Sequence, residues 1–181
     1  MANVLTKNIW TCASLGILSS GPVRVKGIMY YPAAVDGEFT LKWWDEESTT
    51  LRSNGVTYTI TTATDDTVTA SGGTPFPNTW LDGNVAKCLS TTGLDRGKVG
   101  LIQTAGNDTV FVTWESPFTA EAGKVGDWAC YPTYTAFRGK ASKAADTETS
   151  MWFPFGGDGF LFPNLALDDF DTSDVVIIYV G

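Results

Sequence analysis

The side chains best able to do acid–base or metal chemistry in this chain are acidic, because the sequence contains no histidine. Without histidine, neither a Ser-His-Asp or Cys-His catalytic arrangement nor a histidine-ligated zinc or haem site can form. The 20 Asp and Glu residues exceed the 12 Lys and Arg residues, which gives a net charge of −8. Carboxylate- or lysine-based chemistry survives this exclusion.

The densest acidic segment is DDFDTSD at 168–174. A calcium loop needs spaced oxygen ligands and usually a glycine at its tight bend, and this segment lacks the D-x-D-x-D-G pattern. A glycosidase needs two carboxylates about 5–10 Å apart across a cleft, and no pair stands out among the acids. We expect 168–174 to be a solvated turn whose aspartates cap backbone donors. We expect no catalytic, cofactor-binding or metal-binding residue, and no enzyme activity.

The cysteines and the N-terminal segment indicate the compartment. Cys12, Cys88 and Cys130 are odd in number and show no C-x-x-C spacing, which predicts three small buried hydrophobes in a reducing cytoplasm. The first 21 residues lack the charged start and continuous apolar block of a signal peptide. No apolar stretch reaches the length of a membrane span. The acidic balance and the scattered basic residues argue against nucleic acid as a partner.

The elements that would carry these residues are β-strands. Hydrophobic residues make up 43% and charged residues 18% of the chain, and aromatic residues and threonine favour the surface of a sheet. Alternating apolar residues, with turns at Asp36-Gly37 and Asn54-Gly55, predict antiparallel strands over 22–62. Short strands between Gly-, Asn- and Asp-rich turns over 65–114 suggest a small barrel or sandwich. The terminal VVIIYV, at 175–180, predicts a central strand buried on both faces that pairs with the strands near 22–44.

We therefore predict an all-β fold with two parts. Residues 1–62 together with 138–181 form an antiparallel β-sandwich, and residues 63–137 form an inserted small β-barrel-like subdomain. The polar segment 138–150 is expected to be an exposed loop or a seam between the units.

The aromatic residues are the strongest candidates for an interaction site. The adjacent Trp43 and Trp44 must face opposite sides of a strand, so one can lie in the core and the other must be exposed or covered by a neighbour. The segment 152–162 holds five aromatics, more than one thin sandwich can easily bury. They could fill the junction between the two units, anchor another subunit, or offer tryptophan platforms to a sugar. The candidate interface residues are Trp43, Trp44, Trp152, Phe153, Phe155, Phe160 and Phe162.

Two parts of the chain resemble known protein modules. VRVKGIMYYPAAVDGEFTLKWWDE and the later FPNLALDDFDTSDVVIIYVG resemble an arrangement in small structural proteins of tailed bacteriophages, with a V-x-V-x-x-I strand, an F-T-L strand and a terminal V-x-I-Y-V strand. The middle, from DDTVTASGG through WLDGNVAKCLS to ESPFTAEAG, is similar to a small β-barrel module of phage head and tail proteins. Together the two patterns cover about residues 20–62, 66–128 and 152–181.

The resemblance implies a virion component without enzymatic activity, either a capsid decoration (cement) protein or another head or tail accessory protein. Its partners would be the major capsid protein, other virion proteins and sister copies, and it would need no cofactor. Because trimers are common at capsid symmetry points, a trimer is the expected oligomer. The protein would be made in the host cytoplasm and then reside in the virion. The alternatives are a carbohydrate-binding module of a host-attachment structure and, as a remainder, a hydrolase.

Overall fold

The structure, a computed structural model, describes ten segments of the chain, namely residues 4–32, 36–48, 51–60, 68–70, 82–91, 96–104, 110–112, 124–142, 150–169 and 174–181. The regular structure of these segments is β-strand, and the strand pairs with a defined register are antiparallel, which confirms the all-β prediction. The described residues contain no helix long and apolar enough to cross a membrane.

The chain folds into two compact units. The first contains Met1–Trp43 and Tyr134–Gly181, and the second contains Trp44–Thr133. The boundaries therefore differ from the predicted 1–62, 63–137 and 138–181. Strand β6 (Leu51–Ile60) belongs to the second unit, because it pairs with β11 (Lys124–Tyr131). The predicted loop over 138–150 also begins too early, because Arg138 to Ser142 continue β12 (Thr133–Ser142); residues 143–149 lie outside the described segments.

The Asn54-Gly55 pair explains the error at β6. These residues were predicted to form a hairpin turn, but they lie inside the strand. The register of β6 against β11 shifts between Gly126 and Trp128, so that β6 carries an extra residue at this point. Asn and Gly tolerate positive φ, which suits a β-bulge as well as a turn. The strand therefore continues where the sequence predicted a reversal.

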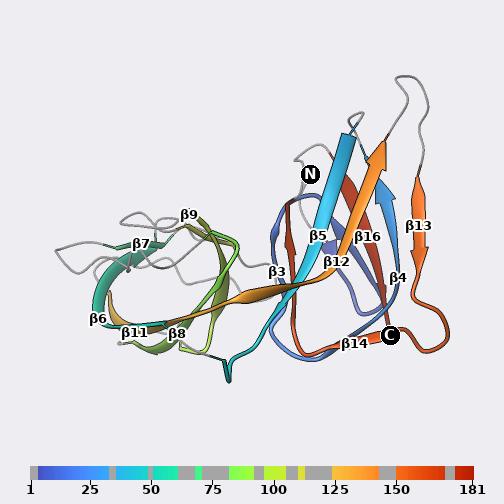
Figure 1. Cartoon of the computed structure of the whole chain (residues 1–181). Coiled ribbons are helices and arrows are strands. Elements are labelled where there is room, and N and C mark those ends of the chain that lie inside the picture. Colours follow the sequence, from blue (N-terminus) through green and yellow to red (C-terminus); the bar gives the residue numbers. More distant parts are fainter. Residues whose placement is uncertain are drawn as a thin grey trace. The chain divides into compact units, whose positions relative to one another are not determined.

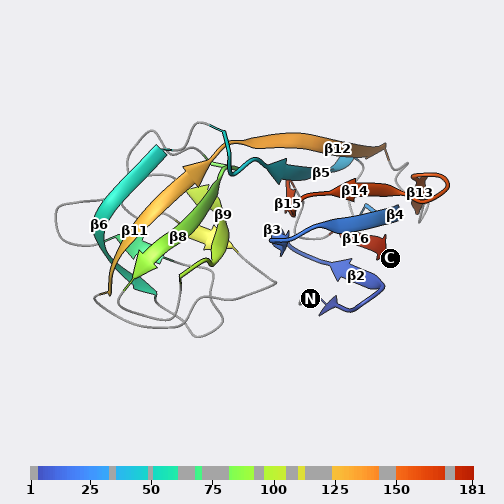
Figure 2. The same cartoon turned by 90° about the horizontal axis from the view of Figure 1, so that it is seen from below.

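The first unit contains two sheets. Sheet A has the order β1 (Val4–Leu5), β2 (Ile9–Cys12), β16 (Val175–Val180), β4 (Val23–Tyr31) and β13 (Met151–Pro154), and β14 (Phe160–Phe162) also pairs with β4. Sheet B has the order β12, β5 (Asp36–Trp44), β15 (Leu165–Asp168) and β3 (Gly16–Ser19). Figure 1 shows β5 beside β12 and β4 beside β16, and Figure 2 shows the same strands from below.

The core of the first unit lies between these two sheets. In sheet A, Val25, Ile28 and Tyr30 of β4 and Val176 and Ile178 of β16 are fully buried, and β5 supplies Phe39 and Leu41 from sheet B. The rings of Tyr30 and Phe39 are 4.8 Å apart across the two layers. Such face-to-face packing of antiparallel sheets is a β-sandwich, as the sequence predicted.

Strand β16 is central, and its two faces differ in burial. It lies between β2 and β4, and Ile178 pairs with Ile28 of β4, as expected from its apolar sequence. Val176, Ile178 and Val180 are buried, whereas the alternate residues of the strand are half-buried. The predicted burial on both faces is therefore wrong, and an apolar row of this strand faces outward.

The second unit is built on sheet C. Its order is β10 (Val110–Val112), β9 (Val99–Thr104), β8 (Val85–Thr91), β11, β6 and β7 (Val68–Ala70). Its core includes Val85, Cys88, Leu101 and Trp128, all fully buried. The hydrogen-bonded path runs from β10 to β7 without closing within the described segments, so the small barrel stays a prediction.

Candidate interaction surface

An edge strand interrupted by a loop shapes one side of the first unit. Strands β13 and β14 both pair with β4, and residues 155–159 (FGGDG) leave the sheet between them. Gly156, Gly157 and Gly159 all have positive φ, so glycine suits each position of this reversal. A methyl group at Gly159 would also overlap the Val25 carbonyl oxygen. Arg24 Nη1 donates a hydrogen bond to the backbone carbonyl of Asp158 in this loop, at 3.2 Å.

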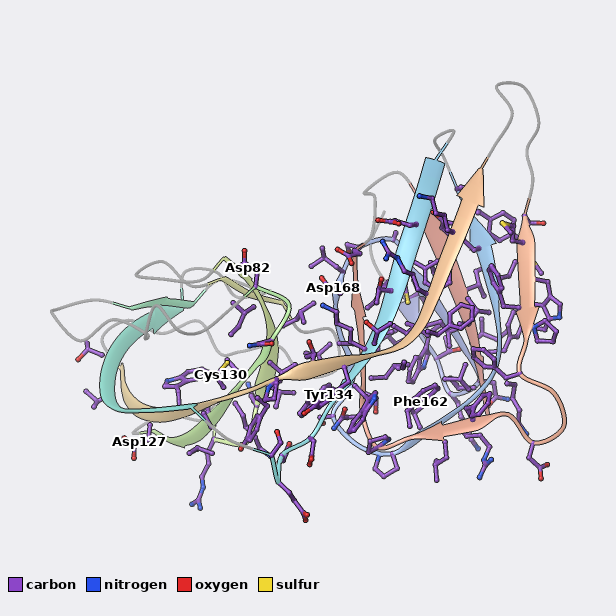
Figure 3. All side chains as sticks on the ribbon, viewed as in Figure 1. Asp82, Asp127, Cys130, Tyr134, Phe162 and Asp168 are labelled. Atoms are coloured by element: carbon purple, nitrogen blue, oxygen red, sulfur yellow. The ribbon has the colours of Figure 1, made fainter. Side chains whose placement is uncertain are left out.

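Five phenylalanines meet at this edge, and we call them the aromatic edge cluster: Phe137, Phe153, Phe155, Phe160 and Phe162. Phe137, from the edge strand of sheet B, contacts Phe153 at 5.2 Å and Phe155 at 5.3 Å between ring centroids. Phe155 contacts Phe160 at 5.4 Å. These three pairs are edge-to-face, a favourable geometry for aromatic rings. Figure 3 shows Phe162 among the packed side chains of this unit.

One end of the aromatic edge cluster belongs to the hydrophobic core, and the other end is exposed to solvent. Phe137 and Phe153 also contact the fully buried Phe39, so this end of the cluster joins the sandwich core. At the other end Phe160 is 59% exposed, and its neighbour Leu161 is 60% exposed. The open side of the sandwich therefore presents Phe160 to solvent, whereas Leu161, the next residue of β14, points to the opposite face of the strand.

Trp152 lies elsewhere, on the outer face of sheet A. Its indole crosses Gly27 of β4 so closely that a methyl group at Gly27 would overlap the ring. The ring of Tyr179 meets it edge-on at 5.2 Å. Trp152 is still 48% exposed. Its position shields a strand glycine and leaves much of the ring to solvent.

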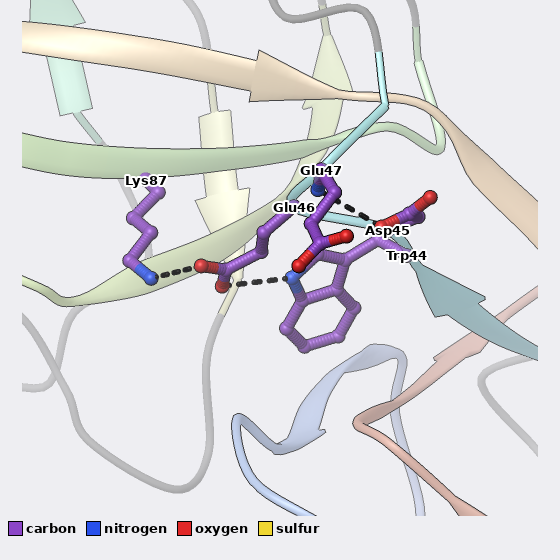
Figure 4. Close-up of polar contacts among 5 residues, drawn as sticks. All are labelled: Trp44, Asp45, Glu46, Glu47 and Lys87. Atoms are coloured by element: carbon purple, nitrogen blue, oxygen red, sulfur yellow. Dashed lines mark hydrogen bonds and ion pairs between the residues drawn. The ribbon is translucent and has the colours of Figure 1, made fainter.

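The two adjacent tryptophans differ in burial, as the alternation of a strand requires. Trp43 is half-buried and stacks on Tyr134 at 4.9 Å, with 30° between the ring planes. Trp44 is 1% exposed, so its ring is not available to a partner. Its Nε1 donates to Glu46 Oε1 at 3.4 Å, and Glu46 also forms an ion pair with Lys87 (Figure 4).

The acidic segment before β16 is more structured than expected. Asp174 is buried and accepts a hydrogen bond from Tyr30 Oη, and Asp168 forms an ion pair with Lys42. The described ends of 168–174 therefore hold specific contacts, which corrects the prediction of a solvated turn; residues 170–173 lie outside the described segments. Within the part of the chain that the structure describes, no three His, Cys, Asp or Glu residues form a group that could hold a metal ion.

The cysteines are buried thiols, as predicted. Cys12 and Cys88 are 0% exposed and Cys130 is 2% exposed. Burial raises the pKa of the Cys12 thiol to about 12, because the thiolate loses its hydration. A thiol that stays protonated is a poor nucleophile.

Comparisons of the chain with protein families, with characterised proteins and with solved structures found no match. The candidate surface therefore depends on the geometry described above.

The structure separates the seven predicted interface residues. Four of them, Phe153, Phe155, Phe160 and Phe162, lie together in the aromatic edge cluster. Trp152 lies on the outer face of sheet A, Trp43 stacks on Tyr134, and Trp44 is buried. The sequence analysis missed Phe137 and Leu161. Phe137 lies in the segment predicted to begin a seam, and its TYTAF pattern was a strand signal.

Proposed function

We propose that this chain is a non-catalytic structural protein of a tailed-phage virion that binds other virion proteins, as a decoration protein on the capsid surface or as another head or tail accessory protein. The observation that carries the proposal is the aromatic edge cluster, whose outer member Phe160 is 59% exposed; Leu161, the next residue of the same edge strand but on its opposite face, is 60% exposed. Large exposed apolar side chains on a folded domain mark protein interaction sites. The resemblance of the flanking segments to phage structural proteins supplies the class of partner.

The mechanism is burial of apolar surface against a rigid edge. Phe160 is held by ring contacts to Phe155 and Phe162, so little side-chain freedom is lost when a partner covers it. Full burial of one large apolar side chain is worth roughly 1.5–3 kcal/mol, so covering the exposed three-fifths of two such side chains contributes roughly 2–4 kcal/mol. Many copies on one shell multiply the effect through avidity.

The neighbouring sheet edges support the same mechanism. Strand β12 ends the order of sheet B and β13 ends that of sheet A, so in the described part of the chain each pairs on one side. Backbone N–H and C=O groups of an edge strand can pair with an extended segment of another chain. A partner segment that covers the cluster would lie next to both edges.

The experiment is incorporation of variants into phage particles. We expect Phe160→Ser combined with Leu161→Ser to lower the copy number per particle at least tenfold, since roughly 1.4 kcal/mol is a factor of ten in binding. The melting temperature should change little, because both side chains are largely exposed. Val125→Ser, at an apolar residue of the second unit that is also exposed, is the matched control and should leave incorporation unchanged. Equal incorporation of all three proteins would refute the proposal.

Trp152 favours a second candidate function, carbohydrate binding on a host-attachment structure. Its ring covers Gly27 and is almost half exposed, which is the arrangement of a flat aromatic platform. The two functions predict different variants to fail. Glycan binding that is lost in Trp152→Ala and kept in Phe160→Ser would favour the carbohydrate-binding module over the decoration protein.

A further inference from the structure

The outer face of sheet A is apolar although no described part of the chain buries it. Val175, Ile177 and Tyr179 of β16 point away from the core and are half-buried. A central strand with one solvated face normally alternates apolar and polar residues. We therefore expect another protein surface to cover the outward-facing apolar residues of β16.

The strand register joins these residues into rows across the sheet. Ile177 pairs with Thr11 of β2 on one side and with Met29 of β4 on the other. Met29 pairs in turn with Trp152, and Thr11 pairs with Val4, so one row crosses five strands. Because directly paired residues point to the same side of a sheet, all five side chains lie on the outer face.

A second row runs parallel to the first. Tyr179 pairs with Ile9 and with Gly27, over which Trp152 lies. Tyr31 pairs with Val175 at the far end of the strands. We call this surface the outer apolar face and define it by its largest members: Ile9, Met29, Tyr31, Trp152, Ile177 and Tyr179.

The charges of sheet A lie at one end. Its six strands contain no Asp or Glu, although the whole chain has a net charge of −8. Their two charged residues, Arg24 and Lys26, flank Val25, which pairs with Val180 at the end of β16. The centre of the outer apolar face, around Met29 and Ile177, is uncharged.

The exposed area is sufficient for a small specific interface. Val4, Ile9, Tyr31 and Trp152 are each between 42% and 55% exposed. Taking about 150–250 Å² for a large side chain, these four and the half-buried residues between them expose roughly 600 Å². Specific interfaces start at about 600 Å² per partner and average about 800 Å². A complex through this face therefore lies at the weak end of specific association.

We propose that two copies of this chain associate by packing sheet A on sheet A about a two-fold axis near Met29 and Ile177. A two-fold interface sets the residues at its axis against their own copies, which requires an uncharged centre. With this axis perpendicular to the strands, the Arg24 and Lys26 end of one copy lies at the opposite end of the other, so that the cations do not meet. Sheets that pack face to face in this way interleave side chains in a layer about 10 Å thick. The two-fold arrangement replaces the trimer expected from capsid symmetry, and it does not depend on the proposed virion partner.

The experiment is sedimentation of the purified full chain over a range of concentrations. We expect a monomer–dimer equilibrium in the micromolar range and no trimer. Ile177→Lys should leave only monomer, because it would place a charge at the centre of the interface. Val125→Lys, which adds the same charge at an exposed apolar residue of the second unit, is the matched control and should keep the dimer.

A second variant distinguishes loss of the dimer from misfolding of the monomer. Thr11→Lys changes a half-exposed polar residue of the same row, so the fold should tolerate it, and it should also abolish the dimer. Circular dichroism should show the same β-sheet signal for all four proteins. A chain that stays monomeric at high micromolar concentration, a trimer, or a dimer that survives both Ile177→Lys and Thr11→Lys would overturn the proposal. Because no phage particle is present, these results leave the proposed virion function to its own test.

Discussion

Removal of one buried hydroxyl should destabilise the first unit strongly. Tyr30 Oη donates to a carboxylate oxygen of Asp174, and these residues are 0% and 1% exposed. Asp174 directly precedes β16, so this bond fixes the start of the central strand of sheet A to β4. A hydrogen bond to a charged group contributes about 1.5–3 kcal/mol, and a buried acceptor that loses its donor also keeps its desolvation cost. We therefore expect Tyr30→Phe to lower the free energy of unfolding by about 1.5–3 kcal/mol.

Thermal and urea unfolding followed by circular dichroism measure this loss. For a domain of this size we expect the melting temperature to fall by roughly 6 °C or more. Tyr31→Phe removes the neighbouring hydroxyl, which donates to Met29 Sδ and belongs to a residue that is 42% exposed, so the loss of stability should stay within about 0.5 kcal/mol. If the two variants lose equal stability, the bond to Asp174 does not hold β16 as described.

Two further predictions concern other buried groups. Gly139→Ala should destabilise the first unit by about 1–3 kcal/mol, because the added methyl group would overlap the Phe39 ring; Gly21→Ala, where the methyl group meets nothing, should be nearly neutral in the same unfolding assay. The raised pKa of Cys12 means that the unfolded thiol loses its proton above pH 9 while the folded thiol keeps it to about 12. Stability should therefore fall by up to about 1.4 kcal/mol per pH unit in this window, and a Cys12→Ala variant that falls equally would contradict this.

The sequence predicted the positions of the strands better than it predicted which strands pair with each other. The alternation in 23–31 and the apolar run 175–180 identified β4 and β16 and their pairing, because burial on the inner face demands that pattern. The Asn54-Gly55 pair misled the prediction, since a bulge inside a strand and a hairpin turn use the same residue types. The long-range pairing of β6 with β11 then set the unit boundary, and no local signal encodes that contact.

The candidate surface was predicted only in outline. Residue type alone indicated that the aromatics of 152–162 exceed what one core needs, but not which rings are buried. Phe153 and Phe160 have the same type and lie seven residues apart, yet one contacts the buried Phe39 and the other faces solvent. That difference depends on the glycine loop between β13 and β14 and on Phe137 from a distant strand.

The most direct test of the proposed function is quantitative mass spectrometry of purified phage particles. If the chain acts as a structural protein through its aromatic edge cluster, it will be present in many copies per particle, and the Phe160→Ser, Leu161→Ser variant will be depleted at least tenfold. Particles that assemble with full stability and contain no copy of the chain would contradict the account.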